Sequence, residues 1–210
     1  MADDRSVIMY AETKDPQPNM KGVFGMPQLE KLRYLVEGKE YQDNAKIEVV
    51  TQNRNCEDLP VGLHFENKDG DFKNDYRFMN TEIINEKLKT VKFRGVNWHV
   101  EVNPTVSAVQ RFQFQAGANP EHNTFVAKTD GDQLKFTFGD VSSHGGEFTF
   151  ATGVSGKITK AWSWPAAPVL GILKIADANN TKMSFSNEGA MQIELDSGIA
   201  TYKYIIPANA

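Results

Sequence analysis

The stretch that decides the fold is WPAAPVLGILKIADANNTKMSFSNEGAMQIELDSGIATYKYIIP, residues 164–207. Pro165 ends an extended segment and suits the first turn of a helix, because its missing N–H would have no partner there. Apolar residues then recur at helical spacing: Val169, Leu170, Ile172, Leu173 and Ala176. Beyond Asn180, apolar and polar residues alternate in three short runs, and Ser197-Gly198 separates the last two. This pattern predicts a helix followed by three antiparallel strands with one buried face.

The same order of strand, helix and three strands occurs twice more, at residues 96–152 and 6–79. In the middle copy, Asn103-Pro104 predicts a helix start and Asp130-Gly131 a hairpin turn. A repeated unit that cannot bury its own apolar face must stack on other copies. The sequence therefore predicts an α+β fold of β-α-β-β-β units, with helices on one face and antiparallel sheets on the other. We expect a first lobe at 1–92 and a second domain at 93–210, joined by a solvated linker at 80–95.

Composition places the chain among ordinary globular proteins, with 40% hydrophobic and 24% charged residues and a net charge of -4. No apolar run has the length of a membrane span, and the N-terminal residues lack a signal-peptide pattern. We therefore expect a cytoplasmic protein with no membrane partner. The single cysteine, Cys56, has no second thiol to pair with.

The chain contains no recognisable catalytic or cofactor motif: there is no nucleotide loop, zinc-finger spacing or nucleophile elbow. Asp69-Gly70-Asp71 lacks the other ligands of a calcium loop and is predicted to be a turn. Three tryptophans, Trp98, Trp162 and Trp164, are candidates for stacking on bases or sugars, although aromatic residues in strands usually belong to the core. The sequence thus predicts no enzyme activity, no cofactor and no metal site.

Basic residues lie on or near the predicted helices, whereas acidic residues gather in strands and turns. The basic set is Lys31, Arg33, Arg111, Lys174 and Lys182. Such a separation suits weak, sequence-independent contact with phosphates by a helical surface. A random surface would also give this imbalance, so the alternative of no nucleic-acid contact stays open.

The order of elements and the residues from Trp164-Pro165 to Pro207 resemble a DNA sliding clamp, most closely those of tailed phages. The stretch from Val23-Phe24-Gly25-Met26 to Leu35 resembles the corresponding helix of a clamp's first domain. The resemblance implies a non-enzymatic processivity factor that tethers a replicative DNA polymerase to duplex DNA, in the cytoplasm of an infected host cell if the protein is viral. Clamps of this kind have four units in two domains, whereas this chain shows three.

The resemblance also implies partners and contact residues. A DNA polymerase and a clamp loader would insert a peptide into a pocket of exposed apolar residues, for which the matching positions are Val91, Phe93, Ile205, Ile206 and Pro207. Strands at 72–79 and 147–151 would be sheet edges that pair head to tail between copies, giving a trimeric ring in the full-length form. Because the first half of the first domain is missing, either by truncation or by nature, we expect weak association.

The competing interpretation is a β-rich phage structural or ligand-binding protein. In that case the helices only cover the sheets, and the tryptophans bind a sugar. The polarity of the exposed helix surfaces separates the two interpretations, because repeated Lys, Arg, Gln and Ser there favour DNA.

Overall fold

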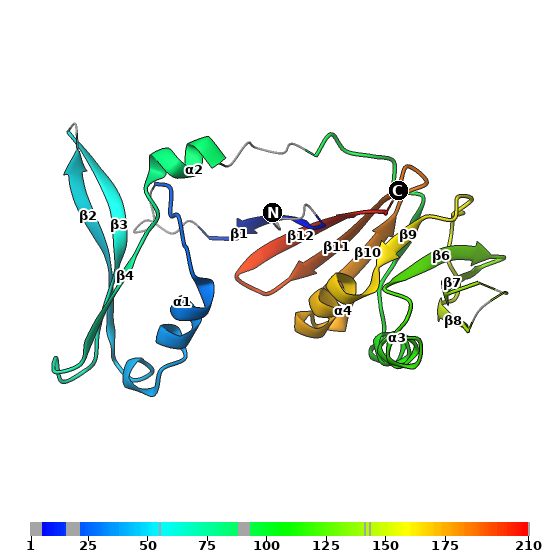
Figure 1. Ribbon diagram of the computed structural model, residues 1–210, viewed down its shortest axis with the longest axis horizontal. Helices are drawn as coiled ribbons and strands as arrows, with labels where there is room; N and C mark the ends of the chain where they lie inside the picture. Colours follow the sequence, from blue (N-terminus) through cyan, green and yellow to red (C-terminus); the bar gives the residue numbers. More distant parts are fainter. Residues whose placement is uncertain are drawn as a thin grey trace. The chain divides into compact units, whose positions relative to one another are not determined.

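The computed structural model describes residues 6–15, 22–54, 56–87, 93–140, 142 and 144–209. The chain divides into two compact units. The larger unit comprises Met1–Asp15 and Arg94–Ala210, and the smaller unit comprises Pro16–Phe93. Both combine α-helices with antiparallel sheets (Figure 1), so the predicted α+β class is confirmed.

The larger unit has two antiparallel sheets. The five-stranded sheet has the order β1 (Ile8–Thr13), β12 (Ala200–Pro207), β11 (Ala190–Asp196), β10 (Thr181–Phe185) and β5 (Val100–Val102). The four-stranded sheet has the order β8 (Gly146–Ala151), β7 (Gln133–Phe138), β6 (Thr124–Asp130) and β9 (Ser163–Pro165). The alternation predicted around the 197–198 turn is present, since β11 and β12 pair through it from Asp196↔Thr201 to Ala190↔Pro207.

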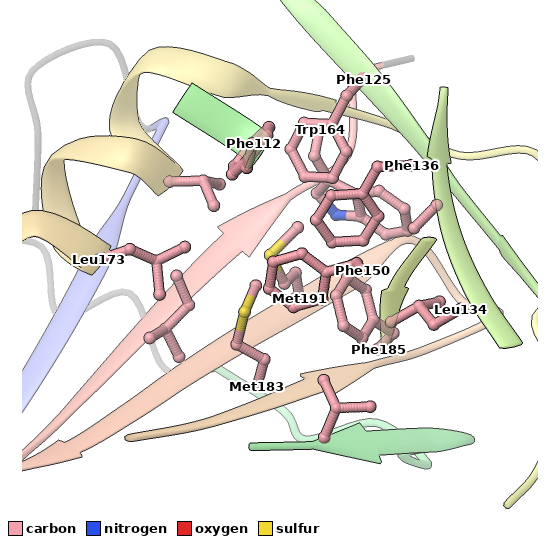
Figure 2. Close-up of a cluster of buried hydrophobic side chains, with 14 of the residues drawn as sticks. Phe112, Phe125, Leu134, Phe136, Phe150, Trp164, Leu173, Met183, Phe185 and Met191 are labelled. Carbon is pink, nitrogen blue, oxygen red and sulfur yellow. The ribbon is translucent and has the colours of Figure 1, made fainter. Parts of the chain in front are cut away.

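Two helices pack beside these sheets and against each other. α3 (Val106–Ala118) contacts β7 and β8, and α4 (Ala166–Ile175) contacts β6. The core between them is rich in aromatic rings (Figure 2): Phe112 of α3 meets Phe125 and Phe136 with ring centroids 4.8 and 5.3 Å apart. A short 3₁₀ helix, η2 (Ala178–Asn180), follows α4. Apolar burial of this extent, far larger than in the smaller unit, makes the larger unit the rigid part of the chain.

The smaller unit is one three-stranded sheet with helical cover. Its elements are α1 (Leu29–Val36), η1 (Lys39–Tyr41), β2 (Lys46–Arg54), β3 (Glu57–Glu66), β4 (Lys73–Arg77) and α2 (Thr81–Lys87), and the strand order is β2-β3-β4. Its main buried cluster consists of Leu35, Tyr41, Phe65 and Tyr76. The Tyr76 hydroxyl donates a hydrogen bond to the carbonyl of Pro27, which ties the segment before α1 to β4.

The N-terminal strand differs from the sequence expectation. We placed it with the first lobe, but β1 pairs with β12 along its whole length, from Ile8↔Ile205 to Thr13↔Ala200. Lys14 then forms an ion pair with Asp196, at 2.6 Å between Nζ and Oδ2. β1 therefore belongs to the larger unit, because its backbone groups find their partners on β12 and not on the sheet that follows in sequence.

The first strands of the two later repeats are shorter than predicted and exchanged between sheets. The middle repeat starts with β5, which pairs with β10 of the last repeat, and the last repeat starts with β9, which pairs with β6 of the middle one. The two repeats are thus interlocked into one unit. The segments before β5 and β9, residues 96–99 and 157–162, form no strand.

The predicted linker contains a helix, so the expectation of a solvated connection at 80–95 was wrong for its first half. In α2, the side-chain oxygen of Asn80 accepts a hydrogen bond from the N–H of Glu82, which caps the first turn. Ile84 is buried, and its side chain lies so close to Gly25 that a side chain at position 25 would clash with it. This apolar anchor explains why the segment is folded.

Candidate nucleic-acid interface

The exposed surface of α3 is polar but carries no carboxylate. Thr105 caps the helix by accepting a hydrogen bond from the N–H of Ala108, and Ala108 and Phe112 point into the core. The opposite side therefore faces solvent, and it presents the polar residues Ser107, Gln110, Arg111 and Gln113 together with the apolar residues Val106 and Phe114. Hydroxyl, amide and guanidinium groups are donors that can bond to phosphate oxygens.

The surface of α4 is smaller and more apolar. Five of its residues are buried, and the exposed positions are Ala167, Gly171, Lys174 and Ile175. Lys174 in the last turn is its only charged residue, so α3 and α4 together carry two cations and no anion. The structure thus places both acid-free segments in helices, as their residue spacing predicts.

Several acidic residues of the larger unit lie on strands and hairpins and are bound by lysines, whereas Glu121 and Asp177 follow α3 and α4 and form no ion pair with a lysine in the described residues. Glu101 pairs with Lys182 at 2.8 Å, Asp130 with Lys135 at 2.6 Å, and Asp196 with Lys14. In each case the hydrogen bond from the lysine ammonium is the main reason that the pKa of the carboxyl group lies below its ordinary value. This pairing offsets much of the negative charge that would otherwise repel a polyanion.

α1 of the smaller unit is less suited to phosphate contact. Arg33 forms an ion pair with Glu37, at 2.8 Å between Nε and Oε1, and Glu30 lies in the first turn. Lys31 is exposed and has no bonded partner among the described residues. The exposed surface of α1 also includes three apolar residues, Leu29, Tyr34 and Val36.

The prediction that Lys182 shares the helical surface was wrong. Lys182 lies on β10, where alternation sends Met183 and Lys182 to opposite faces of the sheet. Met183 is in the core beneath α4 (Figure 2), so Lys182 projects on the other side, where it binds Glu101. Of the five predicted cations, only Arg111 and Lys174 lie on the two neighbouring helices.

The predicted partner-peptide patch is also corrected. Ile205 is 4% exposed and Ile206 is 0% exposed, so neither belongs to an exposed apolar patch. Adjacent side chains of a strand point to opposite faces, so the burial of both residues means that both faces of β12 are covered here, while β1 and β11 pair with its two edges. Pro207 is exposed, Phe93 is half-buried at the end of the smaller unit, and Val91 lies outside the described residues.

The two strands predicted to be sheet edges are edges. β4 ends the order β2-β3-β4, and β8 ends the order β8-β7-β6-β9. β8 is flanked by a groove of about 410 Å³ that Phe114 and Arg111 of α3 line together with Phe148 of β8. Phe114 is 73% exposed, and the sequence analysis did not single it out. In the sequence, Phe114 comes three residues after Arg111 and four after Gln110, which makes it an apolar residue on the polar side of the helix.

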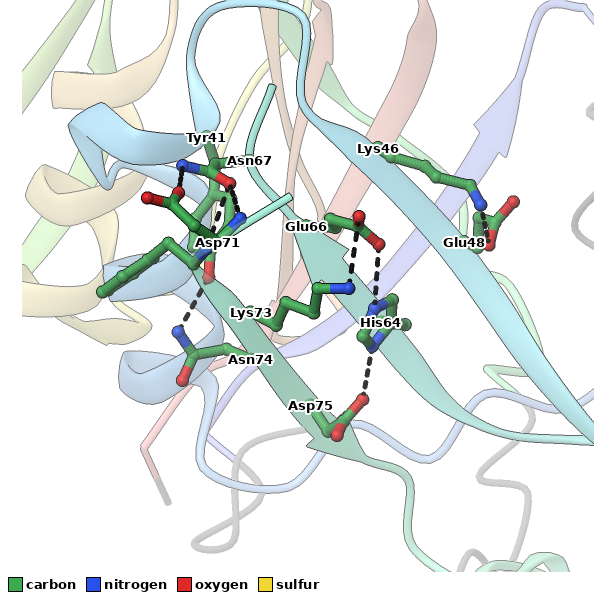
Figure 3. A network of polar contacts seen from close by, with 11 residues as sticks. Tyr41, Lys46, Glu48, His64, Glu66, Asn67, Asp71, Lys73, Asn74 and Asp75 are labelled. Carbon is green, nitrogen blue, oxygen red and sulfur yellow. Dashed lines mark hydrogen bonds and ion pairs between the residues drawn. The ribbon is translucent and has the colours of Figure 1, made fainter. Parts of the chain in front are cut away.

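The smaller unit carries a polar network on its sheet (Figure 3). His64 of β3 bonds to Asp75 of β4 at 2.8 Å, and Lys73 reaches Glu66 at 3.3 Å. The hydrogen bond from Lys73 is the main reason that the pKa of Glu66 is lowered. These pairs cross from β3 to β4 and fix the register of the edge strand.

Of the three tryptophans, Trp98 and Trp162 are half-buried, and only Trp164 is withdrawn from any stacking site by complete burial. Trp162 donates its indole N–H to the carbonyl of Asn187 at 2.8 Å. Within the described ranges, no group of three His, Cys, Asp or Glu side chains is placed to hold a metal ion. Nor does any helix in the described part of the chain have the length and apolar character needed to cross a bilayer.

Comparison with solved structures shows similarity to sliding clamps. The chain is similar to PCNA from Thermococcus kodakaraensis, with a TM-score of 0.57 and 10% identity over 86% of this chain and 71% of that one. It is also similar to the structure of the C-terminal region of FEN-1 bound to A. fulgidus PCNA, with a TM-score of 0.55 and 11% identity over 78% of this chain. In the latter case it spans only 64% of the matched chain.

No protein-family model and no curated protein gave a significant match. At 10–11% identity, the likeness to the PCNA structures concerns the fold. The sliding-clamp fold predicted from the sequence is thereby confirmed.

Proposed function

We propose that this chain is a subunit of a DNA sliding clamp that tethers a replicative polymerase to duplex DNA and has no catalytic activity of its own. We further propose a phage-type clamp, because residues 164–207 resemble phage clamps. A viral clamp would act in the cytoplasm of the infected cell.

One observation carries this proposal: a sliding-clamp fold in which two adjacent helices expose Arg111, Lys174 and several amides without a single carboxylate. Although the net charge of the chain is -4, neither helix carries an acidic residue. Two cations per subunit give weak, salt-sensitive contact with phosphates, which suits a protein that must slide. Strong or base-specific contacts would hold it in place.

We propose that copies associate head to tail through the two edge strands, with β4 of one copy pairing with β8 of the next. The groove beside β8 would then receive the neighbouring copy, and Phe114 would be buried in the contact. Unpaired strand edges and an exposed aromatic side chain next to one of them support this assignment. A trimeric ring is the proposed closed form, and the small core of the smaller unit supports weak association.

Polymerase and clamp-loader peptides are proposed to bind near the C-terminal segment that begins at Pro207. This proposal no longer includes the buried residues Ile205 and Ile206. The backbone beyond them is held in place, since the N–H of Asn209 bonds to the carbonyl of Ser163 at 2.7 Å. A peptide would therefore meet a fixed surface.

The proposed DNA contact is tested with the double variant Arg111→Glu and Lys174→Glu. We expect the full-length protein to lose its salt-dependent affinity for duplex DNA and its stimulation of polymerase processivity, while its circular dichroism and Tm stay the same. The matched control is Lys128→Glu with Lys157→Glu, which makes the same change of charge on exposed residues outside the two helices.

If both double variants weaken DNA binding equally, overall charge and not the helical surface is responsible. Unchanged processivity in the Arg111 and Lys174 variant would overturn the proposed DNA-facing role of the helices.

A further inference from the structure

A polar cavity lies in the smaller unit, at the point where the β2–β3 hairpin extends past the end of β4. β4 pairs only with Gly62–Glu66 of β3, whereas β2 pairs with β3 as far as Glu57. Among the described residues, no strand flanks positions 57–60 of β3 on the β4 side. The chain turns away there, and the N–H of Met79 bonds to the carbonyl of Gly25.

The resulting cavity has a volume of about 160 Å³, enough for one or two side chains. Its apolar lining includes Leu59, Pro60 and Phe78, and its polar lining includes Arg54, Arg77 and Asn80. Both arginines are exposed, while Pro60 is buried. The cavity thus combines an apolar floor with two guanidinium groups, a pairing typical of sites that bind an apolar residue next to a carboxylate.

Neither arginine of this cavity forms an ion pair within the described part of the chain, although Glu57 lies opposite Arg54 in the pairing of β2 with β3. Arg54 donates from Nε and Nη2 to the side-chain oxygen of Gln52, at 3.2 and 3.0 Å, a contact that orients the guanidinium but brings no charge. Asp58 binds Asn53 instead of an arginine. Arg77 has no ion pair in the described residues, although Asp75 and Lys73 on the same strand are both paired.

We propose that this cavity binds an acidic peptide segment of a partner protein. An apolar side chain of the peptide fills the space over Leu59 and Pro60, and an adjacent carboxylate bonds to Arg77 and Arg54. Guanidinium groups bind carboxylates in a planar, two-point geometry, and the apolar floor favours a carboxylate on a peptide over a free phosphate. This inference does not depend on ring formation or on DNA contact.

The probe is the capped peptide acetyl-Leu-Asp-Leu-Glu-Leu-amide, titrated to millimolar concentration into the full-length ¹⁵N-labelled chain. We expect saturable shifts of the backbone amide signals of Leu59, Arg77 and Asn80. The double variant Arg54→Gln with Arg77→Gln should bind about tenfold more weakly or worse, because charge-assisted hydrogen bonds are lost. The control variant Lys39→Gln with Lys68→Gln removes the same charge from exposed positions of this unit that do not line the cavity, and it should bind normally.

Three further titrations can overturn the proposal. Equal binding of acetyl-Leu-Asn-Leu-Gln-Leu-amide would mean that the carboxylates are not recognised. Shifts of the same signals by inorganic phosphate or by a short DNA duplex, without any response to the acidic peptide, would identify a phosphate site instead. The absence of saturable shifts with the acidic peptide would also overturn it.

Discussion

Phe114 offers the sharpest test of the proposed head-to-tail contact, through the variant Phe114→Ala. The side chain is 73% exposed on α3 beside the edge strand β8, so its removal should leave folding almost unchanged. A phenylalanine has roughly 200 Å² to bury, and the exposed part, about 150 Å², corresponds to an upper limit of ~4 kcal/mol at ~25 cal/mol per Å². Because association has its own entropic costs, we expect about 1.5–3 kcal/mol, or ten- to hundredfold weaker association.

The assay is light scattering or sedimentation over a concentration series, with Tm measured in parallel. The control is Ile199→Ala, because Ile199 is equally exposed, at 76%, but lies on the β11–β12 turn outside the groove. The reasoning is refuted if Phe114→Ala associates as strongly as the unmodified chain. A decrease of several degrees in Tm would show instead that Phe114 stabilises the folded subunit itself.

Three other predictions concern stability and are measured by urea unfolding. Trp164→Phe should cost less than ~1.5 kcal/mol and Trp164→Ala about 3–5 kcal/mol. The buried indole N–H of Trp164 has no hydrogen-bond partner in the described structure, so the side chain stabilises the fold through apolar packing. Equal losses in the two variants would contradict this. Asn187→Ala should cost about 2 kcal/mol, because its side chain bonds to the N–H of Thr159 and to the carbonyl of Lys157; a loss near zero would show that this loop is held otherwise. Lys182 lowers the pKa of Glu101 in the folded state, so the pair stabilises the fold at pH values above the unfolded-state pKa of Glu101, and this stability is lost as the pH falls through the folded-state pKa. Lys182→Gln should therefore make the free energy of unfolding depend less on acid pH. An unchanged pH dependence would show that this pair does not cause it.

The sequence was most informative where structure is local. Residues 164–207 predicted α4 and the three strands after it, because helical spacing, a proline at the helix start and strict alternation are properties of the chain itself. The acid-free surfaces of α3 and α4 could also be read from residue spacing. Arg111 and Lys174 could therefore be placed on exposed helix surfaces, while their contact with DNA stays a prediction; the edge positions of β4 and β8 were predicted correctly.

Other site residues could not be assigned in this way. Phe114 looks like any apolar residue within a helix until the buried side of that helix is known. Ile205 and Ile206 show the opposite problem, since alternation allows one of two adjacent residues to be buried but says nothing of what covers the second face. The Arg54 and Arg77 cavity joins residues 23 positions apart, and it exists only because β4 ends before the β2–β3 hairpin does.

The sequence by itself thus determined the elements, their apolar faces and the repeat that leads to a sliding-clamp fold. Only the tertiary structure decided which strands pair: β1 with β12, β5 with β10, and β9 with β6. The physical reason is that backbone hydrogen bonds are the same for every residue, so a strand's sequence specifies which face it buries but not its neighbour. The neighbour is chosen by the shared core, in which the side chains of both later repeats must pack at once.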